Sequence, residues 1–261
     1  MSLTKTETFT LISLIVFLIA INYSWLDSLV IDSFSDDEFV KVDRVIDGDT
    51  IKSNENSIRL LGINTPEKGE KYYREAKDSL NEKILNKTVR LEYGKDKKDR
   101  YNRTLAYIFL NNENINLKQV EQGFANYYFP SGKDVYYNNF KEAWENCIKE
   151  NKNLCEKSKD ICAKCIELKE LNYNSQEAVF YNSCDYDCNL NGWKIKDEGR
   201  KTFIFSNFNL DGNKELKIKV GEGTDNSDIL FWKGEDYVWT KTGDTLFLRD
   251  SEGKLILFES Y

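Results

Sequence analysis

Apolar and polar positions follow three different patterns along the chain. Residues 9–26 are uncharged and consist mostly of Leu, Ile, Phe and Val. Residues 39–160 mix short alternating strands with helical spacing, whereas residues 161–261 carry short apolar runs separated by Gly-containing turns. The pattern predicts an N-terminal segment over 1–38, a mixed domain over 39–160 and an all-β domain over 161–261.

The uncharged stretch over 9–26 is just long enough to cross about 30 Å of hydrocarbon as a helix. A buried core helix and a cleaved signal peptide are the alternatives, but the stretch lacks a polar stripe, is long for a signal peptide and precedes no small-x-small cleavage site. Lys5 precedes it, and no basic residue follows nearby. The stretch therefore predicts one transmembrane anchor, with cleavage and secretion as the alternative. The positive-inside rule predicts that the body lies outside the cytoplasm.

The mixed domain is predicted to be a small barrel with helices on its flank. Short strands and two or three helices in about 120 residues are typical of such a fold. The predicted strands lie within 39–63, 89–93 and 105–110, and the predicted helices are 70–85, 117–124 and 140–154.

The last hundred residues lack helical spacing and predict a β-sandwich. Trp193 is expected in its core, as tryptophans of sandwiches usually are. The apolar runs that predict strands are 179–181, 202–205, 216–220, 229–232, 245–248 and 255–258.

Composition removes several classes of chemistry. The chain has no histidine, which excludes Ser-His-Asp triads, Cys-His dyads and histidine-bearing zinc sites. The net charge is −7, but residues 39–160 carry +3 and residues 161–261 carry −5. A polyanionic partner would therefore favour the mixed domain.

Three clusters in the mixed domain carry candidate chemistry. Asp47-Gly48-Asp49-Thr50 alone reads as a turn, and Thr65-Pro66-Glu67 alone reads as a helix start. Arg59 lies between apolar residues of a predicted strand and so needs an anionic partner, from the protein or from a ligand. The third cluster is Arg100-Tyr101-Asn102-Arg103, which precedes a strand.

Taken together in this order, the clusters resemble the staphylococcal nuclease (thermonuclease) family. The resemblance covers residues 40–155 and includes Glu121-Gln122-Gly123-Phe124-Ala125. It implies a five-stranded OB-type barrel with helices, and calcium-dependent hydrolysis of phosphodiesters. It also implies that Asp49, Asn64 and Thr65 hold the metal, that Glu67 activates the attacking water, and that Arg59 and Arg103 bind the phosphate.

These roles suit the chemistry, because a hard cation with oxygen ligands and two guanidinium groups can neutralise a phosphodiester and its more highly charged transition state. Asn64 departs from the family, which often has aspartate there. Its amide oxygen can still be a ligand but brings no charge, so we expect a lower calcium affinity, with Asp47 as a nearby carboxylate that could compensate.

Aromatic and basic residues near these clusters are candidates for binding the nucleic acid. By resemblance, Arg100 and Tyr101 would contact the nucleotide, and Tyr127 and Tyr128 would lie near another family tyrosine. Stacking aromatics in a basic groove suit single strands. The alternative for the aromatic run at 127–129 is core packing.

Six cysteines lie between positions 147 and 188. Cys162, Cys165, Cys184 and Cys188 have a spacing that could hold Zn²⁺, but disulfides are favoured if the body is exported. Cys147 and Cys155 could form a further pair or stay free.

Residues 165–261 resemble a lamin tail domain through Cys165 to Tyr173, Leu190 to Asp197, Trp232 and the Val238-Trp239 pair. The resemblance implies an immunoglobulin-like sandwich with a binding role and an unknown partner. The sequence as a whole predicts a membrane-anchored, extracytoplasmic, calcium-dependent nuclease acting on DNA or RNA. The alternatives are an OB barrel that binds nucleic acid or protein without cutting, and a structural surface protein.

Overall fold

The computed structural model describes residues 38–261. The predicted anchor at 9–26 lies outside these residues. Within 38–261 there is no helix that is long and apolar enough to cross a membrane.

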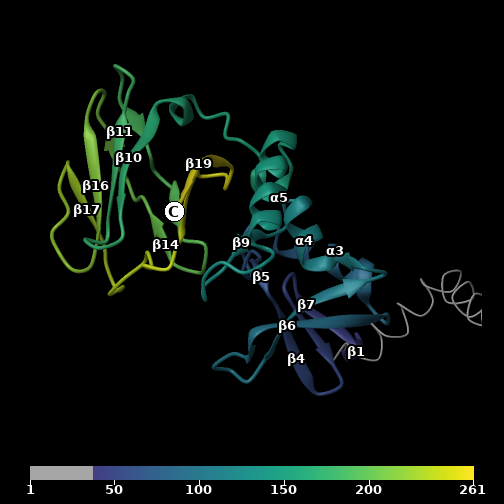
Figure 1. Ribbon diagram of the computed structural model, residues 1–261. Coiled ribbons are helices and arrows are strands. Elements are labelled where there is room, and N and C mark those ends of the chain that lie inside the picture. Colours follow the sequence, from purple (N-terminus) through teal and green to yellow (C-terminus); the bar gives the residue numbers. More distant parts are fainter. Residues whose placement is uncertain (1–37) are drawn as a thin grey trace, which may run out of the picture. The chain divides into compact units, whose positions relative to one another are not determined.

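The N-terminal domain is built on a curled sheet that fits an OB-like half-barrel (Figure 1). Its strands run in the order β1-β6-β7-β4-β3-β2, with β8 paired to β7 and a separate β5-β9 ladder. β4 and β7 are parallel, whereas β2-β3, β3-β4 and β6-β7 are antiparallel. The strands are β1 (Glu38–Lys41), β2 (Arg44–Asp47), β3 (Thr50–Ser53), β4 (Asn56–Leu60), β5 (Gly62–Asn64), β6 (Thr88–Lys98), β7 (Thr104–Leu110), β8 (Glu113–Asn114) and β9 (Asn126–Tyr128).

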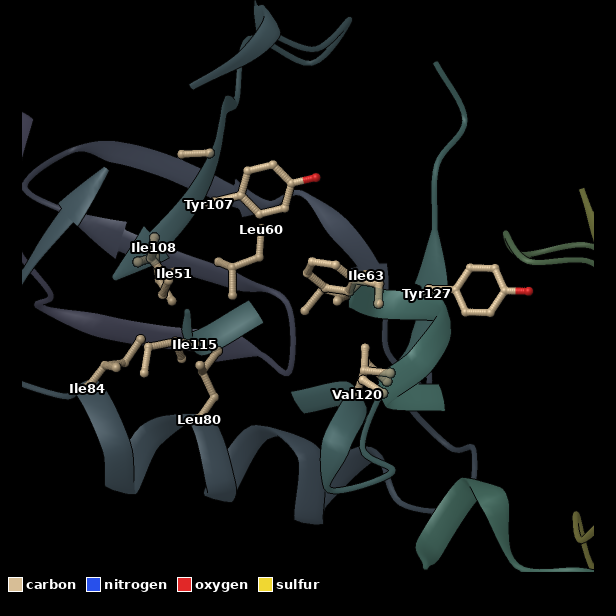
Figure 2. Close-up of a cluster of buried hydrophobic side chains, with 14 of the residues drawn as sticks. Ile51, Leu60, Ile63, Leu80, Ile84, Tyr107, Ile108, Ile115, Val120 and Tyr127 are labelled. Atoms are coloured by element: carbon tan, nitrogen blue, oxygen red, sulfur yellow. The ribbon is translucent and has the colours of Figure 1, made fainter. Parts of the chain in front are cut away.

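Helices α3 (Tyr73–Ile84), α4 (Ile115–Glu121) and α5 (Tyr137–Glu150) pack on this sheet. α3 buries Ala76, Leu80 and Ile84, which are four residues apart and so lie on one face of the helix. Figure 2 shows Leu80 and Ile84 pointing toward the strands. All three predicted helices are present.

The C-terminal domain contains two four-stranded sheets with one apolar core (Figure 1). Their orders are β10-β11-β16-β17 and β14-β13-β18-β19, and β12 pairs with β15. Trp193 is buried in this core, as predicted. The strands are β10 (Ile166–Asn172), β11 (Glu177–Asn182), β12 (Cys188–Asn189), β13 (Lys194–Lys196), β14 (Thr202–Ile204), β15 (Asn209–Leu210), β16 (Glu215–Val220), β17 (Ile229–Trp232), β18 (Thr245–Arg249) and β19 (Leu255–Ser260).

The two domains share part of a core. Phe247 and Leu255 of the C-terminal domain belong to the apolar cluster of the barrel domain. The ring of Trp144 from α5 lies edge-on to that of Phe247, with centroids 5.4 Å apart. The η1 turn (Asn153–Cys155) lies beside this contact, where the Leu154 carbonyl accepts a 2.6 Å hydrogen bond from Arg249. Such a contact favours a fixed junction, because separation would expose large apolar side chains.

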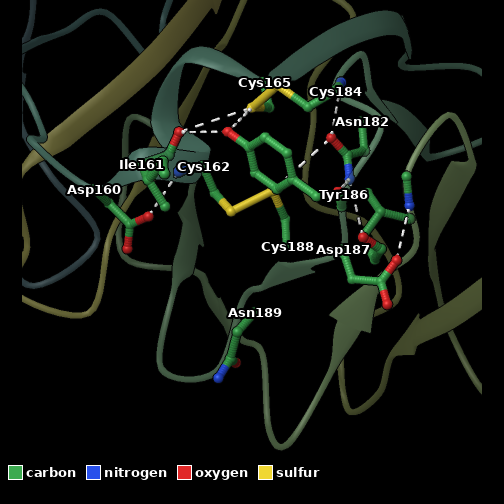
Figure 3. The surroundings of a disulfide bond; sticks show 12 residues. Asp160, Ile161, Cys162, Cys165, Asn182, Cys184, Tyr186, Asp187, Cys188 and Asn189 are labelled. Atoms are coloured by element: carbon green, nitrogen blue, oxygen red, sulfur yellow. Dashed lines mark hydrogen bonds between the residues drawn. A yellow bond between two sulfur atoms is a disulfide. The ribbon is translucent and has the colours of Figure 1, made fainter.

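All six cysteines form disulfides. The pairs are Cys147–Cys155, Cys162–Cys188 and Cys165–Cys184. The last two join the η2 turn (Ile161–Lys164) and the start of β10 to the segment after β11 (Figure 3). The four cysteines that could have held Zn²⁺ are therefore paired with one another, and a sulfur in a disulfide offers no thiolate to a metal.

Candidate active site

The turn between β2 and β3 presents two carboxylates. Asp47 accepts a 3.1 Å hydrogen bond from the backbone N–H of Asp49, which fixes the turn. Gly48 lies so close to α3 that an added Cβ would be 2.8 Å from both Ala76 and Thr65. A side chain at this position would therefore push the helix and Thr65 away from the carboxylates.

Asp49 is the centre of the site. It is 6% exposed, and its Oδ2 accepts hydrogen bonds of 3.0 Å from both the backbone N–H and the hydroxyl of Thr65. The hydroxyl of Thr50 donates to Oδ1, and Arg59 forms an ion pair with Oδ2 at 3.1 Å. A buried carboxylate needs such donors and a counter-charge.

Arg59 finds the anionic partner that its position in β4 requires. The side chain is buried, and besides Asp49 it contacts the Asn64 amide oxygen at 3.3 Å. The other terminal nitrogen donates to the Leu60 carbonyl. Asp49, Arg59, Asn64 and Thr65, which were singled out from separate motifs, are thus brought together.

Burial and the nearby charge of Asp49 raise the pKa of Asp47 to about 6. A divalent cation would relieve this repulsion, and the available oxygens suit calcium. They are the carboxylates of Asp47 and Asp49, the Asn64 amide oxygen and the Thr65 carbonyl. No group of three or more acidic or cysteine side chains within 38–261 is arranged to hold a metal, so any such site would combine these carboxylates with neutral oxygens.

Glu67 directly follows Pro66, and its side chain is half-exposed. Its backbone N–H donates to Glu70 over 2.7 Å. Its carboxylate pairs with the Nε of Arg200, at 2.9 Å, which belongs to the C-terminal domain. The predicted general base is therefore in contact with a cation that sequence reasoning did not select.

Arg103 precedes β7, and its guanidinium pairs with Asp99 at 2.7 Å. The register pairs Leu105 with Arg59, so Arg103, two residues earlier, lies on the same face of the sheet as Arg59. Tyr101 is 62% exposed, and the guanidinium groups of Arg100 and Arg103 lie over its ring, 4.8 and 5.5 Å from the centroid. The loop thus presents the exposed side chain of Tyr101 with two guanidinium groups over its ring.

The structure corrects the prediction that Tyr127 binds the substrate. It is 1% exposed, and its hydroxyl accepts a hydrogen bond from Thr245 of the C-terminal domain. Its ring packs edge-on against Trp144, so it has no face for a base. Tyr128 is half-buried, and burial raises its pKa. The β5–β9 register pairs it with Gly62, two residues before Asn64.

A loop of the C-terminal domain, residues 196–201, lies against the site. The Gly199 carbonyl accepts a 2.7 Å hydrogen bond from the Asn64 amide. The Glu198 carbonyl accepts from Asn126, and its carboxylate accepts from the backbone N–H of Phe129. Sequence reasoning missed Glu198 and Gly199. The one trace of the contact in the sequence is Asn64, an amide where the family often has aspartate.

Three acidic side chains of the C-terminal domain are buried in or beside this loop: Asp197 and Glu198 belong to it, and Asp244 accepts a hydrogen bond from the Glu198 backbone N–H. Burial, reinforced by Asp244, raises the pKa of Glu198 to about 8 and that of Asp197 to about 7. Burial also raises the pKa of Asp244 itself. We therefore expect the contact between the domains to depend on pH.

Comparison with known proteins finds relatives of both domains. Residues 57–157 match the staphylococcal nuclease homologue family, and residues 163–261 match the lamin tail domain. A thermonuclease of Staphylococcus hyicus is 37% identical over 132 residues, which span 47% of this chain and 78% of that protein. A thermonuclease of Staphylococcus intermedius is 35% identical over 126 residues, 44% of this chain and 75% of that protein. An uncharacterized endonuclease of Haemophilus influenzae is 37% identical over 102 residues, 37% of this chain and 56% of that protein.

Proposed function

Since the chain belongs to the staphylococcal nuclease homologue family, we propose that it is a calcium-dependent nuclease that hydrolyses phosphodiester bonds of DNA or RNA. The observation that carries the proposal is the buried cluster of Asp49, Arg59, Asn64 and Thr65, with Glu67 two residues further along the chain. Two carboxylates, neutral oxygens and a buried arginine form a site for a cation and a phosphate together.

Arg59 and Arg103 are the proposed phosphate-binding residues. A guanidinium can donate two parallel hydrogen bonds to phosphate oxygens, which a lysine cannot do. In the structure these groups pair with Asp49 and Asp99, and a bound phosphate would share or replace those partners. Their charge would stabilise the additional negative charge of the transition state.

Glu67 is the proposed general base. A carboxylate near the site can take a proton from the attacking water at neutral pH, so the reaction needs no histidine.

Asp49, Asn64 and Thr65, helped by Asp47, would hold the metal through oxygen atoms. Bound calcium would supply positive charge next to the phosphate. Because Asn64 contributes no charge, calcium affinity is expected to be lower than with an aspartate in its place.

Tyr101 and Arg100 are proposed to bind the substrate, with Tyr128 at the edge of the site. The exposed ring of Tyr101 can stack on an unpaired base, which favours single-stranded or frayed nucleic acid.

We further propose that the body works outside the cytoplasm, anchored by residues 9–26 or secreted after their removal. Three disulfides support an oxidising compartment. The lamin tail domain is expected to be immunoglobulin-like and to bind a partner of unknown nature.

A second function, binding of nucleic acid without cleavage, is favoured by two observations. Asn64 removes a charge from the metal site, and Glu67 is paired with Arg200. Incubation of denatured DNA, duplex DNA and RNA with the protein in millimolar calcium, and in EDTA, separates the two functions. Calcium-dependent cleavage supports the nuclease, and binding without cleavage by folded protein supports the binding module.

A further inference from the structure

The loop of residues 196–201 is held against the nuclease site by contacts along its length. Lys196 pairs with Glu70 at 2.9 Å, the Gly199 carbonyl accepts from Asn64, and Arg200 pairs with Glu67. The loop is itself closed by a hydrogen bond from the backbone N–H of Lys201 to the Asp197 carboxylate. The lamin tail domain therefore presents a defined surface to the site.

The contacts of the loop favour a fixed position beside the site over a lid that opens and closes. The exposed ion pairs alone would hold the loop weakly. However, Phe247 and Leu255 are buried in the same cluster as Trp144 of the barrel domain. Lifting the loop together with its domain would expose these apolar surfaces, which is costly.

The side chain at position 64 is of the type that the hydrogen bond to the Gly199 carbonyl requires. The Asn64 amide can donate to the Gly199 carbonyl, whereas a carboxylate would place an acceptor against an acceptor at 2.7 Å. The amide is thus the side chain that can serve both the metal site and the loop.

Arg200 is the cation that the loop adds. Four of the thirteen basic residues of 161–261 lie within 194–201, although this domain has a net negative charge. Lys196 and Lys201 are occupied by Glu70 and Glu235. Arg200 uses only its Nε on Glu67 among the described residues, and its side chain is 62% exposed. Its two terminal NH₂ groups can therefore reach a ligand in solution.

We propose that Arg200 is a substrate-binding residue, supplied by the lamin tail domain, which contacts a backbone phosphate of a nucleic-acid strand bound at the barrel. The inference rests on the proposed function only in that the barrel binds nucleic acid. Glu67 would orient the Arg200 guanidinium through its Nε, and the NH₂ groups would bind the phosphate. The nuclease site would thus be completed by a second domain.

The test is binding of a fluorescein-labelled single-stranded oligonucleotide to the full-length protein in detergent, followed by anisotropy in EDTA from 50 to 300 mM KCl. Arg200→Gln should weaken binding about fivefold near 100 mM salt and reduce the slope of log affinity against log salt by about 0.7, which is the effect of one lost phosphate contact. Arg200→Lys should keep most of the slope, since it keeps the charge.

Lys214→Gln is the matched control, because Lys214 is exposed on the same domain and loses the same charge. It should behave as wild type. Unchanged affinity and slope in Arg200→Gln would overturn the proposal, and so would tighter binding, which would mean that the loop obstructs the site. Because binding is measured without calcium, a failure to cleave DNA would refute the nuclease function and leave this test intact.

Discussion

The side-chain amide of Asn64 donates a 2.7 Å hydrogen bond to the carbonyl oxygen of Gly199, 135 residues later in the chain. The same side chain presents its oxygen to Arg59 at 3.3 Å. One residue therefore joins the candidate metal site, the phosphate-binding arginine and the second domain.

Asn64→Asp should separate these roles. The lost donor and the new carboxylate facing a carbonyl should lower the free energy of unfolding by about 1–3 kcal/mol in EDTA. The added charge should strengthen calcium binding. Urea unfolding and calcium titration measure the two effects, with Asn56→Asp, at the exposed first residue of β4, as the control. Equal stability of Asn64→Asp and wild type in EDTA would contradict the role of this hydrogen bond.

The raised pKa of Glu198 predicts that the stability of the protein depends on pH. Its pKa is raised from 4.5 to about 8, so between these values the folded protein binds a proton that the unfolded chain has released. Stability should fall as pH rises from 4.5 to 8, and Asp197, raised to about 7, acts in the same direction.

Glu198→Gln should therefore flatten this dependence and stabilise the protein by about 1–3 kcal/mol at pH 8. Exposed Glu215→Gln is the control. Unfolding in urea at pH 5, 6.5 and 8 measures the change. A variant whose stability declines with pH as steeply as wild type would refute this account of the buried carboxyl groups.

Because Phe247 of the lamin tail domain is buried in the core of the barrel domain, we predict that the two domains unfold in a coupled manner. Phe247→Ala should cost about 3–5 kcal/mol and should weaken the barrel as well as the lamin tail domain. Phe180→Ala, which belongs only to the core of the lamin tail domain, should leave the barrel transition closer to wild type. Hydrogen exchange of α5 amides distinguishes the variants. Protection of α5 that is unaffected by Phe247→Ala would show that the shared core does not stabilise the barrel.

Each disulfide should stabilise the domain that contains it, the barrel domain for Cys147–Cys155 and the lamin tail domain for the other two. Cys162 and Cys188 are 26 residues apart, so replacing both by Ala should cost about 3–4 kcal/mol through the entropy of the unfolded chain. The pair Cys147 and Cys155, eight residues apart, should cost about 2–3 kcal/mol. Urea unfolding of each double variant gives these values. No loss of stability in the first variant would argue against this disulfide.

Local patterns were sufficient to predict most strands of the barrel domain and its three helices, but not the short strands β8 and β9. The roles of the residues around Asp49 came from the family resemblance, because each motif alone looked structural. Arg59 nevertheless has to find an anion because it lies on a strand between Ile58 and Leu60, which are both buried. β10 and β13 were not predicted, because their exposed charged residues hide the alternation.

Contacts between the domains could not be predicted from the sequence. For Tyr127 the sequence left substrate binding and core packing open, and the contacts with Trp144 of the same domain and with Thr245 of the lamin tail domain decide for packing. Arg200 lies in a charged turn that resembles any exposed loop, and only the folded chain brings it to Glu67. Such pairings depend on how two domains dock, which no periodicity records.

The most direct test of the central claim is cleavage of denatured DNA by full-length wild type, Arg59→Ala and Glu67→Ala in millimolar calcium and in EDTA. Arg44→Ala, an exposed arginine on β2, is the control. We predict calcium-dependent cleavage that falls about 100- to 1000-fold in Arg59→Ala, falls strongly in Glu67→Ala and is unchanged in Arg44→Ala. Absence of cleavage by folded wild type, or equal activity of Arg59→Ala and wild type, would contradict the account.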